Sequence, residues 1–167
     1  MKREKAGDYK AAVSSYEMAL QYARRSGYTR FEAFVLTGIG DIYIDLNAVD
    51  EAMNAYQQAS ILAHSLHINF LQVYLNIQQA AVACAKGNFT ESYRLLDEAR
   101  ATTLRDNMVI ELHLCNLEYG GIKIKEGKPQ EVVDLLEKAG AFFAAGGHKT
   151  QREKASLYLT LAYGQMD

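Results

Sequence analysis

Apolar residues recur at spacings of three and four along most of this chain, which is the pattern of amphipathic α-helices. The clearest series are Val13, Tyr16, Leu20 and Ala23, and then Ala52, Met53, Tyr56 and Ala59. Short segments rich in glycine, asparagine and charged residues separate these runs. The pattern predicts a chain of helices joined by short turns.

The residues that break the helical runs form two series, each with a spacing of 40 residues. The two series are Gly7, Asn47, Gly87 and Gly127, and Gly27, His67, Asn107 and Gly147. Glycine and asparagine suit helix ends where the chain turns through positive φ, and histidine is also enriched there. We therefore expect an internal repeat of 40 residues that contains two antiparallel helices of roughly 16–18 residues.

This register divides the chain into a single helical array. We expect a stub and a second helix in 1–27, full helix pairs in 28–67, 68–107 and 108–147, and a further first helix in 148–167. Asp8 and Asn88 are candidate helix N-caps, and Pro129 suits the first turn of a helix. Since helices are missing at both ends of this register, we also expect either a segment of a longer array or association through uncovered ends.

A small residue returns at the same place in every helix pair. Alanine occupies four equivalent positions, namely Ala19, Ala59, Ala99 and Ala139. Large residues stand three positions earlier, at Tyr16, Tyr56, Leu96 and Leu136. Close-packed helices have no room for a larger side chain at such sites, so these positions predict the contact between paired helices.

The clearest repeat resembles the tetratricopeptide (TPR) signature. Its residues are Leu36, Ile39, Gly40 and Tyr43, followed by Ala52, Tyr56 and Ala59. The resemblance implies an all-α fold, a right-handed α-α superhelix of antiparallel helix pairs. The repeats depart from the usual length of about 34 residues, and the usual terminal proline is absent. The later repeats match less well, because Gln79 and Tyr119 replace Ile39.

TPR units of 40 residues are similar to those of large bacterial transcriptional regulators of the maltose-activator-like and antibiotic-regulatory activator types. The segments 40–46 and 144–147 also resemble these regulators. That likeness implies a non-enzymatic, cytoplasmic segment that binds a protein partner or senses a ligand for a regulator.

Composition and charge narrow the classes of function. The chain has 18 basic and 20 acidic residues, a net charge of −2, which argues against direct binding of nucleic acid. No apolar run reaches the length of a membrane span. Residues 31–60 hold five acidic side chains and no basic one, whereas residues 1–30 hold seven basic ones.

Catalytic, cofactor and metal motifs are missing from the sequence. It contains no phosphate-binding loop of the Walker type, no H-E-x-x-H, no G-x-S-x-G and no C-x-x-C. Cys84 and Cys115 are expected to be buried thiols, and His67 occupies a turn position, which disfavours a metal site shared with His64. We expect neither an enzyme nor a bound cofactor.

The first helices of TPR pairs line a concave groove that binds peptides or partner helices, so function is expected on that face. The candidate groove residues are Phe34, Thr37, Asp41, Ile44, Tyr74, Ile77, Ala81, Leu114, Leu117, Gly121 and Ile124. The same residues could instead serve only packing. Two further alternatives are an oligosaccharide site near Tyr74, Asn76, Asn116 and Tyr119, and self-association through the last helix, where Leu157, Leu159, Leu161 and Tyr163 are apolar.

Overall fold

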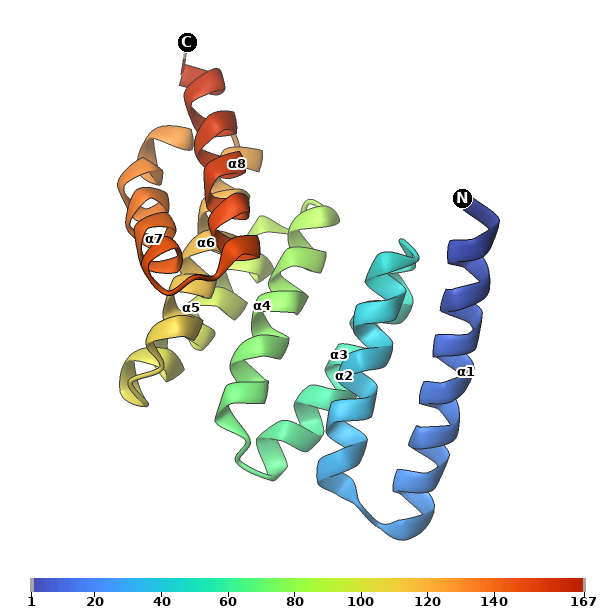
Figure 1. Cartoon of the computed structure of the whole chain (residues 1–167). Coiled ribbons are helices and arrows are strands. Elements are labelled where there is room, and N and C mark those ends of the chain that lie inside the picture. Colours follow the sequence, from blue (N-terminus) through green and yellow to red (C-terminus); the bar gives the residue numbers. More distant parts are fainter. Residues whose placement is uncertain (1, 167) are drawn as a thin grey trace. The chain divides into compact units, whose positions relative to one another are not determined.

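The computed structural model describes residues 2–166, with side chains described at position 9 and from position 11 onward (Figure 1). These residues form eight α-helices and one 3-10 turn, and none of them lies in a strand. The helices are α1 (Lys2–Ser26), α2 (Thr29–Asp45), α3 (Val49–Ser65), α4 (Asn69–Ala85), α5 (Phe89–Arg105), α6 (Val109–Lys125), α7 (Val133–Ala145) and α8 (Lys149–Met166), with η1 (Pro129–Glu131) before α7. The all-α prediction is confirmed.

The chain divides into two compact units. Unit 1 runs to Leu75 and unit 2 begins at Asn76, so the boundary falls inside the continuous helix α4. Helices α2 to α6 each have 17 residues, within the predicted length. None of the helices in the described part of the chain is long and apolar enough to span a membrane.

The predicted breakers after position 7 all lie in turns with positive φ. They are Gly27, Asn47, His67, Gly87, Asn107, Gly127 and Gly147, so the two series interleave to place a turn every 20 residues. At Gly87 the N–H donates to the carbonyl of Cys84 (3.0 Å), and the next N–H, of Asn88, donates to that of Ala83 (2.9 Å). This pair of hydrogen bonds is the Schellman motif, which satisfies the last carbonyls of the helix.

One predicted turn is not present. α1 runs without a break through Gly7 and Asp8, so the helix end and the N-cap predicted there were wrong. A glycine inside a helix costs only about 1 kcal/mol relative to alanine. Glycine alone therefore does not end a helix unless other interactions favour a turn at that position.

Two other predicted helix starts are found, with differences in detail. The Asn88 side chain accepts a hydrogen bond from the N–H of Glu91 (3.2 Å). The Glu91 carboxylate bonds Arg94 and does not return to the N-cap, so only half of a capping box forms. Pro129 opens the 3-10 turn η1, and this turn shortens the following helix α7 to 13 residues.

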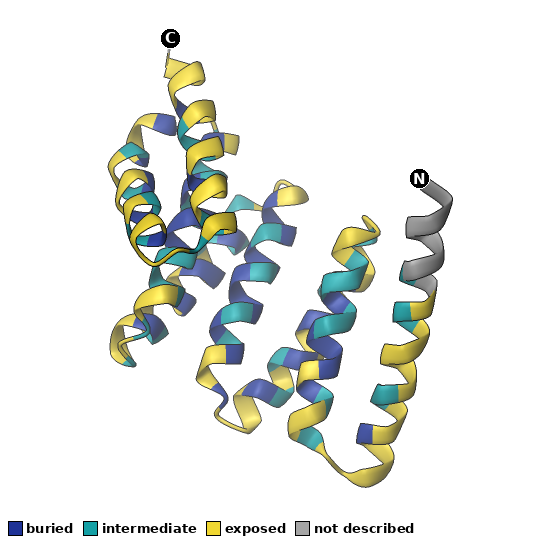
Figure 2. Ribbon diagram, in the orientation of Figure 1, coloured by how far each residue is buried: buried dark blue, intermediate teal, exposed yellow. Residues whose placement is uncertain are grey.

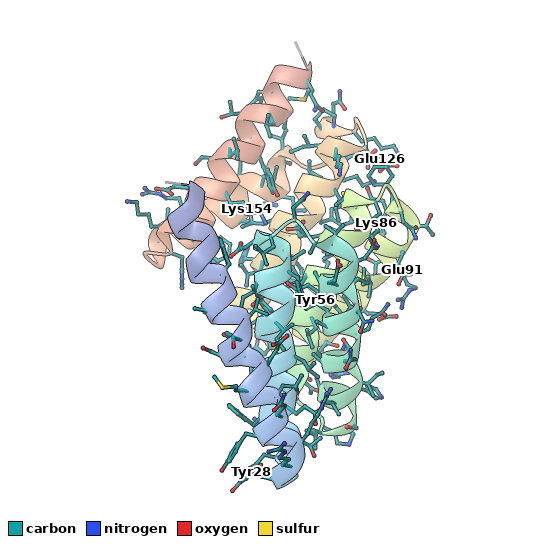
Figure 3. All side chains as sticks on the ribbon, turned by 90° about the vertical axis from the view of Figure 1, so that its right-hand side faces the viewer. Tyr28, Tyr56, Lys86, Glu91, Glu126 and Lys154 are labelled. Atoms are coloured by element: carbon teal, nitrogen blue, oxygen red, sulfur yellow. The ribbon has the colours of Figure 1, made fainter. Side chains whose placement is uncertain are left out.

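Paired helices contact each other where glycine and alanine permit a close approach. A Cβ placed on Gly40 of α2 would overlap the ring of Tyr56 in α3, and Tyr56 is fully buried. Figure 3 shows Tyr56 among the helices of unit 1. Of the four equivalent alanines, Ala59, Ala99 and Ala139 are also fully buried. This confirms the packing role that the repeat predicts for these positions.

One buried hydrophobic cluster of unit 2 lies between α6, α7 and α8. Its buried residues are Leu117, Ile124, Val132, Leu136, Ala139, Phe143, Ala155 and Ala162. In contrast, most residues of α1 and of α8 whose burial is described are exposed (Figure 2). These two helices therefore have faces that no other part of the described chain covers.

Candidate functional site

The predicted groove residues of α2 lie on one face of unit 1 with different exposure. Phe34 and Ile44 are exposed, Asp41 is half-buried, and Thr37 is buried. The Thr37 hydroxyl donates to the carbonyl of Ala33 (2.8 Å) within its own helix. Phe34, Asp41 and Ile44 are thus accessible from solution, whereas Thr37 packs.

Asp41 joins three helices of unit 1 through a single oxygen. Its Oδ1 accepts hydrogen bonds from the hydroxyls of Tyr56 in α3 (2.7 Å) and Tyr74 in α4 (3.0 Å). Burial, together with the charge of Asp41, raises the pKa of both tyrosines well above the ordinary value, so both hydroxyls stay protonated as donors. No hydrogen bond or ion pair of the described residues uses the Oδ2 of Asp41 or involves the exposed Asp45 one turn later.

An aromatic pair lies two helical turns from Asp41, on the same side of α2. Phe34 of α2 and Phe70 of α4 stack with their ring centroids 6.0 Å apart and 29° between the ring planes. Phe34 is 36% exposed and Phe70 is 47% exposed. Phe70 was missed at the sequence level, although its position one helical turn before Tyr74 could have indicated the shared face.

A hollow of about 360 Å³ lies between α1 and α2 in unit 1. It is lined by Ser15, Tyr16, Ala19, Phe31, Phe34 and Val35. The ring of Tyr16 covers Gly38, where a Cβ would overlap it. Tyr16 and Phe31 are accessible aromatic residues that the groove prediction did not include. Tyr16 lies in a second helix, and Phe31 lies in the first helix α2 but before the first predicted groove position, Phe34.

A second hollow of about 350 Å³ lies where α1, α2 and α3 meet, and its lining is more polar. There Arg24 of α1 donates to the carboxylate of Glu32 (2.7 Å) and to the side-chain oxygen of Gln58 (3.4 Å). These partially exposed bonds connect α1 to both neighbouring helices. We interpret this second hollow as a contact region in which Arg24 attaches α1 to α2 and α3.

The predicted groove residues of α4 and α6 are mostly engaged in packing. Tyr74, Ala81, Leu114 and Gly121 are half-buried, while Ile77, Leu117 and Ile124 are buried. Leu117 belongs to the core of unit 2, and Leu114 packs against that core. A Cβ on Gly121 would overlap the ring of Tyr158 in α8. The binding role of these positions stays a prediction.

Charged and aromatic side chains of unit 2 mostly contact one another. Lys154 of α8 donates to the buried carboxylate of Glu118 (2.8 Å). Lys123 lies over the rings of Tyr93 and Tyr119, with Nζ 4.9 and 5.6 Å from their centroids. These contacts stabilise the helix packing of unit 2.

The residues considered for an oligosaccharide site have little access to a ligand. Asn76 and Asn116 are buried, and Tyr119 is half-buried beneath Lys123 and Arg100. Sugar binding requires amides and aromatic faces that meet the ligand. We find no such accessible cluster among these residues.

Neither the histidines nor the cysteines form a reactive site in the part of the chain that the structure describes. His64 and His67 are exposed, and no three His, Cys, Asp or Glu side chains come together as metal ligands within this part. Cys84 and Cys115 are buried without a disulfide. Burial raises the pKa of the Cys115 thiol to about 12, which keeps it protonated and unreactive at neutral pH.

Comparisons with known proteins identify the fold. No family model matches the sequence, and no curated protein has significant similarity to it. Two crystal structures of the nearly identical TPR-like repeats of a putative kinesin light chain from Podosopora anserina are similar in structure. The first has a TM-score of 0.70 at 17% sequence identity, and the alignment covers 98% of this chain and 81% of the chain in that structure. The other has a TM-score of 0.68 at 18% identity, with 98% and 82% covered. The chain therefore has the fold of TPR-like repeat proteins, in which neighbouring antiparallel helices pack on one another.

Proposed function

We propose that this chain is a non-enzymatic scaffold that binds a protein partner on one face of unit 1. That face, here the α2–α4 face, is defined by Phe34, Asp41, Ile44, Phe70 and Tyr74. The observation that carries the proposal is an exposed aromatic pair that lies two helical turns along α2 from a carboxylate, which two tyrosine hydroxyls hold in place. TPR-like folds commonly bind protein partners, which supports this choice over an enzyme.

The chemistry of the α2–α4 face suits a partner with apolar anchors. Burying the exposed part of an aromatic side chain contributes up to about 1.5–3 kcal/mol, and a few such residues dominate the affinity of most interfaces. The Oδ1 of Asp41 accepts from Tyr56 and Tyr74, so the carboxylate is a fixed acceptor on the same face as the aromatic pair. A partner side chain with an N–H or ammonium group would bind there without reordering the carboxylate.

Peptide display followed by binding measurements tests the proposal. Peptides selected against the chain should bind Phe34→Ala and Phe70→Ala at least tenfold more weakly than the unchanged protein. The matched control is Ile61→Ala, which removes an exposed aliphatic side chain from α3 and should change affinity less than twofold. Selected peptides that bind all three variants equally would contradict the proposed face.

A more specific proposal concerns the biological setting. We propose that the array is the interaction or sensing segment of a cytoplasmic bacterial transcriptional regulator, on the basis of its 40-residue repeats. Sequencing the full reading frame tests this proposal. A DNA-binding or nucleotide-binding domain in the same frame would support a regulator, and a frame that encodes a protein of another class would contradict it.

Self-association is a second candidate function, and α8 provides the observation that favours it. Leu157 is 57% exposed, whereas Thr37, Ile77 and Leu117 are buried at the equivalent positions of α2, α4 and α6. Leu161 and Tyr163 extend this exposed surface. If it mediates association, sedimentation equilibrium should show mass that rises with concentration, and Leu157→Lys should abolish that rise.

A further inference from the structure

The hollow where α1, α2 and α3 meet corresponds to a place in unit 2 that side chains fill. The 40-residue register, applied twice, matches these three helices to α5, α6 and α7. Every helix around the hollow therefore has an equivalent, and the difference between the two places lies in their side chains. The volume of the hollow, about 350 Å³, is at the lower end of the range of about 300–1,000 Å³ that ligand pockets take.

Two tyrosine rings and an ammonium group occupy the place in unit 2. The rings of Tyr93 in α5 and Tyr119 in α6 have their centroids 5.4 Å apart. The Nζ of Lys123 lies 4.9 and 5.6 Å from these centroids, and it pairs with the carboxylate of Glu131 at 2.9 Å. The rings, the ammonium group and the carboxylate thus form one set of mutually favourable contacts.

Both rings are missing from the equivalent place in unit 1. Val13 of α1 is equivalent to Tyr93, and Ile39 of α2 is equivalent to Tyr119. Val13 and Ile39 both line the hollow. Because valine and isoleucine are smaller than tyrosine, the space that two rings take in unit 2 stays open in unit 1, with apolar side chains along it.

The hollow keeps the negative charge of its counterpart but lacks the cation. Tyr43 stands at the position of Lys123, whereas Glu51, in the first turn of α3, is equivalent to Glu131. Glu17 of α1 adds a second carboxylate to the lining. Both carboxylates are exposed, and neither takes part in a side-chain hydrogen bond or ion pair among the residues that the structure describes. The hollow therefore combines an apolar space of aromatic size with negative charge at its rim.

We propose that this hollow binds a small aromatic amine, in which a short aliphatic linker joins one aromatic ring to a protonated amino group. The ring lies against Val13 and Ile39 and replaces the rings of unit 2. The ammonium group donates to the carboxylate of Glu51 and replaces that of Lys123. A linker of two carbons keeps the ammonium group within about 6 Å of the ring centroid, the range in which Lys123 lies from its two rings.

Other classes of small molecule suit the hollow less well. A neutral aromatic molecule would fill the apolar space but leave the carboxylates without a cation, and an anionic one would be repelled by them. A short alkylamine would meet the charge but bury little apolar surface. Arg24, the basic residue in the lining, is already paired with Glu32 (2.7 Å). The residues of the α2–α4 face do not line this hollow, so the amine site is separate from the proposed protein-binding face.

Titration with 2-phenylethylamine tests the proposal. An alkylamine has a pKa close to that of lysine, about 10.4, so the probe is a cation at pH 7. Amide chemical shifts of the full chain, measured by NMR, should change saturably, with the largest changes in the lining of the hollow. Two matched probes separate the requirements: 2-phenylethanol has the ring without the charge, and butylamine has the charge without the ring. Each should bind at least tenfold more weakly than 2-phenylethylamine.

Variants of the protein locate the binding. Val13→Tyr and Ile39→Tyr each restore a ring of unit 2, from α1 and from α2, and should weaken binding of 2-phenylethylamine at least tenfold. Met18→Tyr is the matched control, because it adds the same ring to an exposed position of α1 outside the hollow. Glu51→Gln should weaken binding at least fivefold, whereas Asp45→Asn, which removes an exposed carboxylate outside the hollow, should change it less than twofold. Circular dichroism checks that each variant is folded.

Three outcomes would overturn the amine site. These are shift changes that do not saturate, equal binding of 2-phenylethylamine and either matched probe, and binding that is unaffected by Glu51→Gln and by the ring-restoring variant that folds. Phe70→Ala, on the α2–α4 face, should change binding of 2-phenylethylamine less than twofold. Display-selected peptides test that face separately, so failure of the amine site and failure of the proposed function can be told apart.

Discussion

At the residue scale, contacts between a glycine and a large side chain hold the paired helices together. Gly40 and Gly120 each accept the large residue of the adjacent second helix, Tyr56 or Leu136, both of which are fully buried. Interiors packed at this density tolerate little added volume. The stability of a helix pair therefore depends on these glycines as much as on the apolar residues that they face.

Gly40→Val should destabilise unit 1. The new side chain would overlap the Tyr56 ring, and overpacking of this kind costs about 1–3 kcal/mol. Urea unfolding followed by circular dichroism measures the change. Gly164→Ala is the matched control, because no atom lies within 4 Å of the added Cβ in α8. The control should be neutral or stabilising by about 0.5–1 kcal/mol.

The buried tyrosines predict a loss of stability in alkali. Burial raises the pKa of Tyr56 and Tyr74 above the value of about 10 for an unfolded chain. Their contribution is fully present below pH about 10 and is lost as the pH rises through the folded-state pKa. Urea unfolding between about pH 8 and pH 11 should show a falling free energy of unfolding that Tyr56→Phe makes less steep. An unchanged slope would contradict this assignment.

At the element scale, positive-φ residues determine where each helix ends. Glycines and three non-glycine residues, Asn47, His67 and Asn107, share this conformation. A residue with a Cβ costs roughly 1–2 kcal/mol there. Three residues with a Cβ nevertheless adopt this conformation. We infer that the packing of the two flanking helices determines the position of each turn.

Substitutions at two turns should therefore have opposite effects. Gly87→Ala, at φ 78°, should lower the free energy of unfolding by roughly 1–2 kcal/mol, because alanine disfavours that conformation. His67→Gly, at φ 53°, should leave stability unchanged or raise it. Thermal unfolding of both variants measures the difference. Equal effects of the two substitutions would show that the positive φ at these turns does not determine their contribution to the free energy of unfolding.

At the scale of the whole molecule, the chain consists of two compact units that share α4. In repeat proteins each helix pair contacts chiefly its neighbours, so a local change in stability spreads only over short distances. A buried hydrophobic cluster of unit 2 lies between α6, α7 and α8, and the α2–α4 face proposed for binding lies in unit 1. We expect binding and the stability of unit 2 to be separable.

Leu136→Ala tests this separation. Removing a fully buried leucine should cost about 2–5 kcal/mol in unit 2. Hydrogen exchange followed by mass spectrometry should show faster exchange in α6, α7 and α8, while α2 and α3 keep their protection. Equal loss of protection in both units would show that the chain unfolds as a single cooperative domain.

Most of the helical architecture could be predicted from the sequence, and the candidate site only in part. The helix ends at Gly87 and Asn107 follow from the breaker spacing, and the Gly40–Tyr56 contact follows from the TPR-like residues. The helix end predicted at Gly7 was wrong, because a glycine in the sequence does not show whether the surrounding structure favours a turn there. Phe70 and Tyr16 were missed because their exposure depends on which helices lie beside them.

The sequence by itself determined the period, the turn positions and the all-α fold, because these depend on local backbone preferences and on residue spacing. Only the tertiary structure decided which groove positions are accessible. Thr37 and Phe34 share one helix, yet one is buried and the other exposed. Tyr16 and Tyr56 hold equivalent positions in the repeat, but only Tyr56 is fully buried. Exposure depends on the neighbouring helix, and no local sequence pattern records whether that neighbour is present.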